Sequence, residues 1–260
     1  MSHGRSLVIR AALVTSVVAV LGVVGLTLTP ALGKSTRTPS PRLAIGQSAA
    51  VGALFTTSGG QLATHFCTAS VVASPSGDLV LTAAHCVSGH QSGPIVFVPG
   101  YANGQTPFGI WTVTKIIVDQ NWQSSFNPDD DFAFLIVRRA GSSATVQSLT
   151  GAESVGIDEP TGGPVTVVAY PDGLNTPISC DNNSLSYSPT QLEFDCNGYT
   201  DGTSGGPFLI STAGSDGPGM VIGVIGGYEQ GGLTPSVSYA ARFGPSMAVL
   251  YRTAIAEAGP

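Results

Sequence analysis

Three side chains of the types that carry out nucleophilic catalysis occur along the chain in the order His85, Asp131 and Ser204. His85 lies in the segment LTAAHC, Asp131 stands directly before the apolar run FAFLIV, and Ser204 lies in the glycine-rich segment DGTSGGP. A serine nucleophile needs a base that accepts its proton, and an imidazole base needs a group that fixes its tautomer. Each of the three residues, taken alone, could have a purely structural role. The neighbouring acids Asp129 and Asp130 are expected to be solvated residues of a turn. The three together predict serine hydrolase chemistry.

The order of these residues separates the classes of serine hydrolase. Residues 202–206 match the G-x-S-x-G pattern of α/β-hydrolases, but those enzymes place the histidine after the serine, and no histidine follows His90. Subtilisin-like enzymes run Asp, His, Ser, and the only acid between residue 34 and His85 is Asp78. The order His, Asp, Ser is therefore the informative feature.

With this order, the sequence resembles the secreted bacterial members of the trypsin-like, chymotrypsin-fold serine protease family. The motifs that carry the resemblance are TAAHC at residues 82–86, Asp131 before FAFL, and GTSGGP at residues 202–207. The resemblance covers residues 44–257. It implies that His85 is general base and then general acid, that Asp131 orients His85, and that Ser204 attacks the carbonyl. The backbone N–H groups of Gly202 and Ser204 would form the oxyanion hole.

The resemblance also implies how the elements position these residues. We expect an all-β protein of two packed six-stranded antiparallel β-barrels with a C-terminal α-helix. Short apolar runs punctuated by Gly, Pro, Asn and Ser are themselves typical of such a fold. The first barrel is expected over residues 44–145, the second over 160–243, and the helix over 245–257. His85 and Asp131 would come from the first barrel and Ser204 from the second.

The four cysteines predict two disulfides rather than a metal site. They form no CxxC pair, and an even number of cysteines in an exported chain favours disulfides. Three connectivities are possible, of which the local pairing Cys67–Cys86 and Cys180–Cys196 is the simplest. The resemblance also includes the Cys67–Cys86 pair. The histidines lack metal-ligand spacing, so no metal or other cofactor is expected.

The chain departs from the family pattern beside the serine. Thr203 stands where most members have an aspartate that pairs with a newly freed amino terminus. The nearest candidate for that terminus is Ile45-Gly46, so the usual zymogen switch is not supported. Gly198 occupies the position of the acid at the base of a trypsin-like pocket, so a preference for Lys or Arg is not supported either.

Other candidate substrate-binding residues surround the serine in the sequence. Asp201 is expected at the mouth of the pocket, with an exposed turn acid as the alternative. Gly226, Gly227 and Tyr228 match the segment that pairs with the substrate backbone. Glu229 and Tyr239 are further candidates for the pocket lining.

Charge and the amino terminus define partners and location. Only 10% of the residues are charged, with ten Lys and Arg against sixteen Asp and Glu, which excludes a nucleic-acid binder.

Residues 1–33 resemble a signal peptide, followed by a flexible leader at 34–43. An uncleaved membrane anchor through residues 11–29 is the alternative. We expect a secreted monomer without stable membrane association after cleavage, acting on protein or peptide substrates. The alternatives are an esterase with the same triad and a catalytically silent binding protein.

Overall fold

The structure is a computed structural model that describes Met1 and residues 38–44, 48–89, 94–211 and 218–260. The expected signal peptide and the Ile45-Gly46 candidate terminus lie outside the described residues. None of the described helices is both long enough and apolar enough to cross a membrane.

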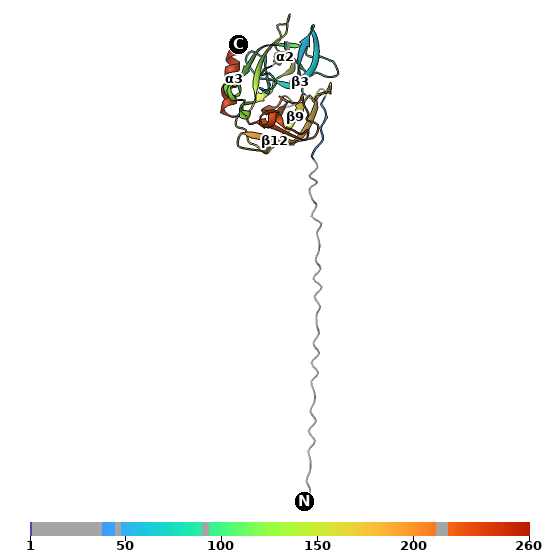
Figure 1. The fold of residues 1–260 in the computed structure, drawn as a ribbon, viewed down its shortest axis with the longest axis vertical. Coiled ribbons are helices and arrows are strands. Elements are labelled where there is room, and N and C mark those ends of the chain that lie inside the picture. The colour runs from blue at the N-terminus through green and yellow to red at the C-terminus, as the bar shows by residue number, and fades with distance from the viewer. Residues whose placement is uncertain (2–37, 45–47, 90–93, 212–217) are drawn as a thin grey trace. The chain divides into compact units, whose positions relative to one another are not determined.

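The first half of the fold is a closed β-barrel in which every neighbouring pair of strands is antiparallel. Its six strands follow the order β2-β3-β4-β7-β6-β5 around the barrel. β3 is the strand of this barrel that is labelled in Figure 1. β7 lies between β4 and β6, and every residue of this strand except the last is buried, as expected of an apolar run covered on both faces. The strands are β2 (Val51–Ser58), β3 (Gln61–Val72), β4 (Leu79–Thr82), β5 (Ile95–Pro99), β6 (Trp111–Val118) and β7 (Ala133–Arg138).

The second half consists of two sheets. A six-stranded sheet has the order β1-β10-β9-β13-β14-β8, and a three-stranded sheet has the order β11-β12-β15. A bridge between Ile225 and Ala240 joins the end of β14 to β15. The strands are β1 (Arg42–Leu43), β8 (Ser154–Val155), β9 (Pro164–Ala169), β10 (Ile178–Asn183), β11 (Leu185–Ser186), β12 (Gln191–Asp195), β13 (Pro207–Ile210), β14 (Met220–Val224) and β15 (Val237–Ala241).

The predicted all-β fold with two barrel-like halves is confirmed, and the second half differs in detail from a closed six-stranded antiparallel barrel. It recruits β1 and β8 from segments before and between the expected barrels, and β8 pairs with β14 in parallel. These strands are only two residues long, too short to produce an alternating pattern in the sequence.

Short helices connect the strands, and one longer helix closes the chain. The short ones are α1 (Gln120–Ser125), α2 (Val146–Thr150) and the 3₁₀ helices η1 (Pro128–Asp130) and η2 (Tyr228–Gly231). α3 (Pro245–Ala258) begins with proline in its first turn, where a missing N–H costs nothing. Its residues Met247, Leu250 and Ala254 join the core of the first barrel, and Tyr251 stacks on Phe134. The predicted terminal helix is therefore present.

Residues 38–43, which belong to the expected leader, are bound to the second half. Arg42 and Leu43 pair with Ser179 and Ile178, and the guanidinium of Arg42 lies 2.7 Å from the Asp181 carboxylate. The N–H of Asn197 donates to the Pro39 carbonyl at 2.9 Å. Proline already holds this segment extended, so little entropy is lost when it covers the open edge of β10.

Glu153 is a buried acid in the connection between the two halves. Its side chain is fully buried, and the one hydrogen bond that it makes among the described residues is accepted from the Ser48 hydroxyl at 3.4 Å. Desolvation raises the pKa of Glu153 from 4.5 to about 8, against a smaller opposing effect of Ser48. The native state therefore holds a proton that the unfolded chain releases above about pH 4.5.

This proton predicts a loss of stability as the pH rises. Between pH 4.5 and 8 the native state binds one proton more than the unfolded state, so Glu153 lowers the free energy of unfolding by about 1.4 kcal/mol for each pH unit. Glu153→Gln removes this contribution. We expect the Tm of the wild type to fall more steeply from pH 5 to pH 8 than that of the variant, measured by calorimetry in matched buffers. Parallel pH dependence of the two proteins would contradict the prediction.

Candidate active site

His85 and Asp131 are joined by two hydrogen bonds within the first barrel. His85 lies in the turn after β4, and Asp131 follows η1 directly before β7, which is the strand next to β4. The His85 Nδ1 lies 2.7 Å from Asp131 Oδ2, and the His85 backbone N–H donates to Oδ1 at 2.9 Å. Because a carboxylate only accepts hydrogen bonds, Nδ1 donates to it, and Nε2 of the neutral ring keeps a free lone pair.

A third hydrogen bond to Asp131 comes from the second half. The Gly227 N–H donates to Asp131 Oδ2 at 2.9 Å, and the carboxylate is completely buried. A Cβ on Gly226 would lie 2.9 Å from the same oxygen, so this position requires glycine. The structure thus places Gly226 and Gly227, expected in the substrate-pairing segment, against Asp131.

Gln191 is a site residue that the sequence reasoning missed. Its Nε2 donates to Asp129 Oδ1 at 2.6 Å, and its Oε1 accepts from the Tyr228 N–H at 3.0 Å. The side chain therefore ties the acidic segment before Asp131 to the Gly227-Tyr228 segment. A glutamine at the start of a strand carries no sequence signal of such a contact.

The two acids beside Asp131 are not simply solvated. Asp129 binds Gln191, and Asp130 is buried and accepts hydrogen bonds from the side-chain amides of Asn121 and Asn127 at 3.2 and 2.7 Å. The expectation of a solvated turn acid is therefore wrong for Asp130, which is buried, whereas Asp129 stays partly exposed. The polar side chains that surround them come from neighbouring elements, which a charge run does not reveal.

Ser204 lies in the loop between β12 and β13, and local hydrogen bonds hold this loop. The Thr203 hydroxyl donates to the Thr200 carbonyl at 2.6 Å, and the Thr203 side chain is buried. The Gly205 N–H donates to the Ile225 carbonyl at 2.7 Å. Gly202 has φ +86° and lies so close to Tyr170 that a Cβ would come within 2.7 Å of its carbonyl oxygen. Glycine is thus required at the bend before the serine.

The two backbone amides predicted for the oxyanion hole are unpaired among the described residues. Within the described part of the chain, the N–H groups of Gly202 and Ser204 have no hydrogen-bond acceptor. Both residues instead use their carbonyls, which accept hydrogen bonds from Thr68 of the first barrel. The loop is therefore anchored through its acceptors while these two donors remain unpaired.

Ser204 borders two cavities. One of about 400 Å³ is also lined by His85, Phe66 and the Cys67–Cys86 disulfide. The other, of about 510 Å³, extends between Tyr199–Asp201 and Gln230–Pro235, with Thr203, Ile225 and Asp172 completing its wall. Asp201 borders both cavities and Gly202 the first. The structure thus brings His85 and Ser204 to the same hollow.

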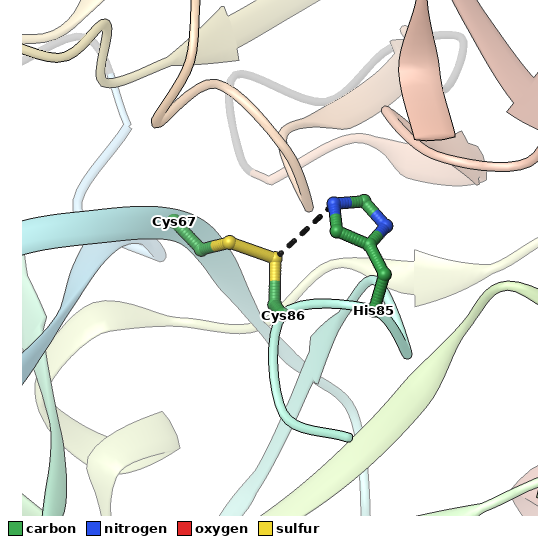
Figure 2. Close-up of side chains that lie close together, drawn as sticks. All are labelled: Cys67, His85 and Cys86. Carbon is green, nitrogen blue, oxygen red and sulfur yellow. Dashed lines mark hydrogen bonds between the residues drawn. A yellow bond between two sulfur atoms is a disulfide. The ribbon is translucent and has the colours of Figure 1, made fainter. Parts of the chain in front are cut away.

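No hydrogen bond joins His85 to Ser204 in the described structure. The His85 Nε2 lies 3.9 Å from the Cys86 sulfur (Figure 2). Catalytic hydrogen bonds in unliganded sites are often long and tighten with substrate. His85 and the two cysteines form a cluster with metal-ligand atom types, but Cys67 and Cys86 are joined in a disulfide and offer no thiolate. The second disulfide is Cys180–Cys196, so the pairing is the local one.

The structure places three predicted pocket residues, Gly198, Tyr228 and Tyr239, outside both cavities. Gly198 has φ +84° and faces Pro41, whose Cγ would lie 3.3 Å from an added Cβ. Tyr228 packs against Tyr187 and Tyr239 with ring centroids 4.9 and 5.1 Å apart. Its hydrogen bond to Tyr187 and the nearby Glu229 carboxylate raise the pKa of Tyr228 to about 12, so it stays protonated at neutral pH. Glu229 lines the smaller cavity.

A family model agrees with the motifs. The model of the trypsin-like peptidase domain matches residues 67–224, a range that contains His85, Asp131 and Ser204. No curated protein sequence matches the chain.

Solved bacterial proteases share the fold. The protease Anisep from Arthrobacter nicotinovorans is 26% identical with a TM-score of 0.68, over 84% of this chain and 98% of that one. A thermostable serine protease, AL20, from an extremophilic microorganism is 25% identical with a TM-score of 0.67, over 81% and 98%. A Glu endopeptidase shares the fold alone, at 16% identity and a TM-score of 0.65 over 84% and 97%.

Proposed function

The chain belongs to the trypsin-like peptidase family, and we propose that it is a secreted serine endopeptidase that cleaves peptide bonds through an acyl-enzyme on Ser204. The observation that carries the proposal is the hydrogen bond between His85 Nδ1 and the buried Asp131 carboxylate. His85 lines the same cavity as Ser204. This bond leaves Nε2 as the basic nitrogen of the ring.

The proposed reaction has two stages. His85 Nε2 takes the Ser204 hydroxyl proton as the oxygen attacks the peptide carbonyl, and Asp131 stabilises the imidazolium. The negative oxygen is bound by the Gly202 and Ser204 N–H groups. His85 then gives its proton to the leaving amine. Water, deprotonated by His85, attacks the ester that remains, and the Ser204 oxygen leaves with the proton from His85.

The order of the serine loop does not depend on a freed amino terminus in this proposal. The position beside the serine carries the neutral Thr203, whose hydroxyl is satisfied by Thr200 within the loop. A buried aspartate there would require a cationic partner, whereas a threonine does not. We therefore propose that removal of a leader serves export rather than assembly of the site.

The larger cavity indicates which substrate side chains are disfavoured. Its lining includes the carboxylates of Asp172 and Asp201 and no basic side chain. An acidic substrate side chain would meet like charge there, so we propose that the pocket takes uncharged side chains in preference to acidic ones.

Export is supported by the two disulfides, which persist in oxidising compartments.

Covalent labelling tests the proposed nucleophile. The purified protein is treated with an organofluorophosphate or sulfonyl fluoride, and the labelled peptide is identified by mass spectrometry. We expect one label per chain, on Ser204, because among the described residues it carries the only hydroxyl that lines the cavity with His85, the proposed base. A folded sample that takes up no label, or takes it elsewhere, would overturn the assignment.

Matched substrates then separate a peptidase from an esterase. A peptide amide and the corresponding ester with the same uncharged side chain before the scissile bond are compared at equal concentrations of labelled sites. We expect both to be hydrolysed. Hydrolysis of the ester alone would favour the esterase, and labelling without turnover of either would favour a binding role.

A further inference from the structure

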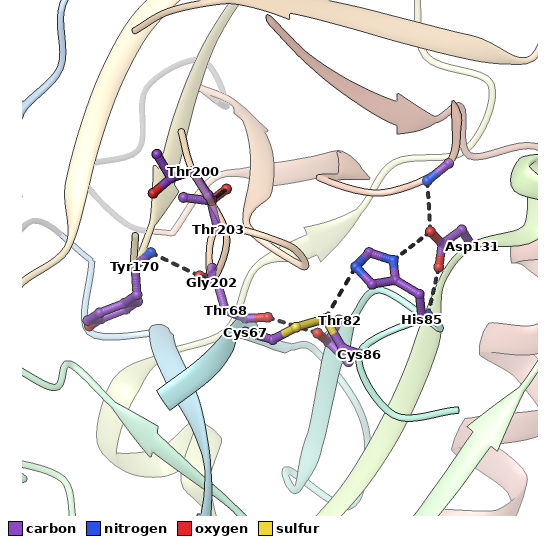
Figure 3. Close-up of a disulfide and its surroundings, with 11 residues drawn as sticks. Cys67, Thr68, Thr82, His85, Cys86, Asp131, Tyr170, Thr200, Gly202 and Thr203 are labelled. Atoms are coloured by element: carbon purple, nitrogen blue, oxygen red, sulfur yellow. Dashed lines mark hydrogen bonds and ion pairs between the residues drawn. A yellow bond between two sulfur atoms is a disulfide. The ribbon is translucent and has the colours of Figure 1, made fainter. Parts of the chain in front are cut away.

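Thr68 connects the two halves of the active site, because three of its four hydrogen bonds reach the second half and the fourth stays within the first barrel. It lies in β3 directly after Cys67 and is completely buried. Its backbone N–H, its backbone carbonyl and both functions of its hydroxyl each have a partner. Figure 3 shows Thr68 with three of these partners: Thr82, Tyr170 and Gly202. None of these four partners is in Thr68's own strand or in β2, to which β3 is paired.

Two of the four hydrogen bonds reach the serine loop on either side of Thr203. The Thr68 hydroxyl donates to the Gly202 carbonyl at 3.0 Å, and the Thr68 N–H donates to the Ser204 carbonyl at 2.7 Å. These carbonyls belong to the two residues whose N–H groups would bind the oxyanion. The carbonyl and the N–H of one residue lie in two planar peptide groups that meet at its Cα, so fixing the carbonyl restricts rotation about that Cα and limits the directions in which the N–H can point.

The other two hydrogen bonds fix Thr68 itself. Its hydroxyl accepts from the Tyr170 N–H at 2.9 Å, and its carbonyl accepts from the Thr82 hydroxyl at 2.8 Å. Tyr170 is the residue whose carbonyl packs against Gly202, and Thr82 ends the strand that leads to His85. A Cβ on Gly205 would lie 2.1 Å from the Thr68 carbonyl, so the serine loop rests directly on this residue.

We propose that Thr68 is a positioning residue that holds the oxyanion hole in register with His85 through its side-chain hydroxyl. The inference rests on the proposed function, because it assigns Thr68 to the same site. The hydroxyl acts at the junction of three segments, where it binds Gly202 and Tyr170 at once. A valine has the same shape but would leave the Tyr170 N–H and one acceptor of Gly202 unpaired and buried.

The test compares Thr68→Val, Thr68→Ser and a matched control. Thr150→Val also removes the hydroxyl of a buried threonine, but that hydroxyl binds only the carbonyls of Val146 and Gly151, in and beside α2. We expect Thr68→Val to lower kcat by about 10- to 100-fold with KM nearly unchanged, less than the 10²- to 10³-fold typical for loss of a whole oxyanion donor. Thr68→Ser and Thr150→Val should stay within about threefold of the wild type.

A transition-state mimic provides a second measurement. A peptide aldehyde forms a hemiacetal with the serine and places an oxyanion in the hole, so its inhibition constant should rise by the same factor as kcat falls. Unchanged aldehyde affinity, a rise in KM alone, or a loss equal to that of Thr150→Val would overturn the proposal. If Thr68→Val does not fold, Thr68→Ala replaces it, and equal kcat values for the alanine and serine variants would overturn the proposal.

Hydrogen exchange separates this proposal from the proposed function. The Tyr170 amide should exchange faster in Thr68→Val than in Thr68→Ser, because only serine keeps the acceptor. Unchanged exchange would overturn the role of the hydroxyl whatever the activity. Faster exchange in a protein whose wild type neither labels at Ser204 nor cleaves peptides would instead contradict the proposed function, and with it the catalytic meaning of Thr68.

Discussion

Replacing Ser204 with alanine is expected to lower kcat for a peptide amide by about 10⁶-fold, because the substitution removes the oxygen on which the proposed acyl-enzyme forms. Some catalysis should remain, since substrate binding and the Gly202 and Ser204 backbone amides are unaffected by the substitution. That residual activity is expected at roughly 10³- to 10⁴-fold above the uncatalysed rate. The measurement is steady-state hydrolysis by protein purified free of other proteases.

The double variant Ser204→Ala with His85→Ala tests whether the two side chains act as a unit. A base without a nucleophile has no proton to accept, so the second substitution should add little to the loss caused by the first. If the two losses in kcat multiplied instead, the result would show that His85 does not act as the base for Ser204. Ser148→Ala, which removes an exposed hydroxyl in α2, is the matched control and should retain full activity.

The general fold and the three candidate catalytic residues could be predicted because their signals are local. His85 and Asp131 adjoin apolar runs that become the neighbouring strands β4 and β7. The glycines around Ser204 indicate close backbone approach, and Gly202 and Gly205 are indeed packed where a Cβ would clash. Residue order then separated this family from others with similar short motifs.

The contacts that hold the site together could not be predicted, because they join residues far apart in the sequence. Thr68 is 134 residues from Gly202, and Gln191 is 62 residues from Asp129. Neither side chain belongs to a local pattern. A threonine in a strand or a glutamine at the start of a strand can also occur without any such role. The polar atoms of Thr68 and Gln191 meet their partners only where the two halves pack together.

Gly198 lies outside both cavities for a related reason. Counting six residues back from Ser204 to Gly198 assumes a fixed loop length, yet Cys196 already lies further from the serine than is usual in the family. In the structure the chain turns at Gly198 toward Pro41, and Tyr199, Thr200 and Asp201 line the cavity instead. Gly198 contacts Pro41, which belongs to the expected leader, a segment that the sequence did not predict to be bound.

Asp131→Asn is the second substitution expected to have a large effect, with a decrease in kcat of about 10⁴-fold at neutral pH. The carboxylate accepts from three N–H groups: one at Oδ1 and two at Oδ2. An asparagine has only one oxygen, so its NH₂ must face an N–H donor in either orientation. If the NH₂ faces the ring, Nδ1 becomes the acceptor and the proton moves to Nε2, which can no longer accept from Ser204.

If instead the oxygen faces the ring, the tautomer survives but the negative charge that stabilises the imidazolium is lost. Ring ¹⁵N shifts of His85 distinguish these two orientations, and kcat measures their common consequence. Asp130→Asn is the matched control, because Asp130 is the neighbouring buried acid, and among the described residues its carboxylate binds only the side chains of Asn121 and Asn127. A loss of less than about tenfold in Asp131→Asn, or an equal loss in Asp130→Asn, would remove Asp131 from the proposed mechanism.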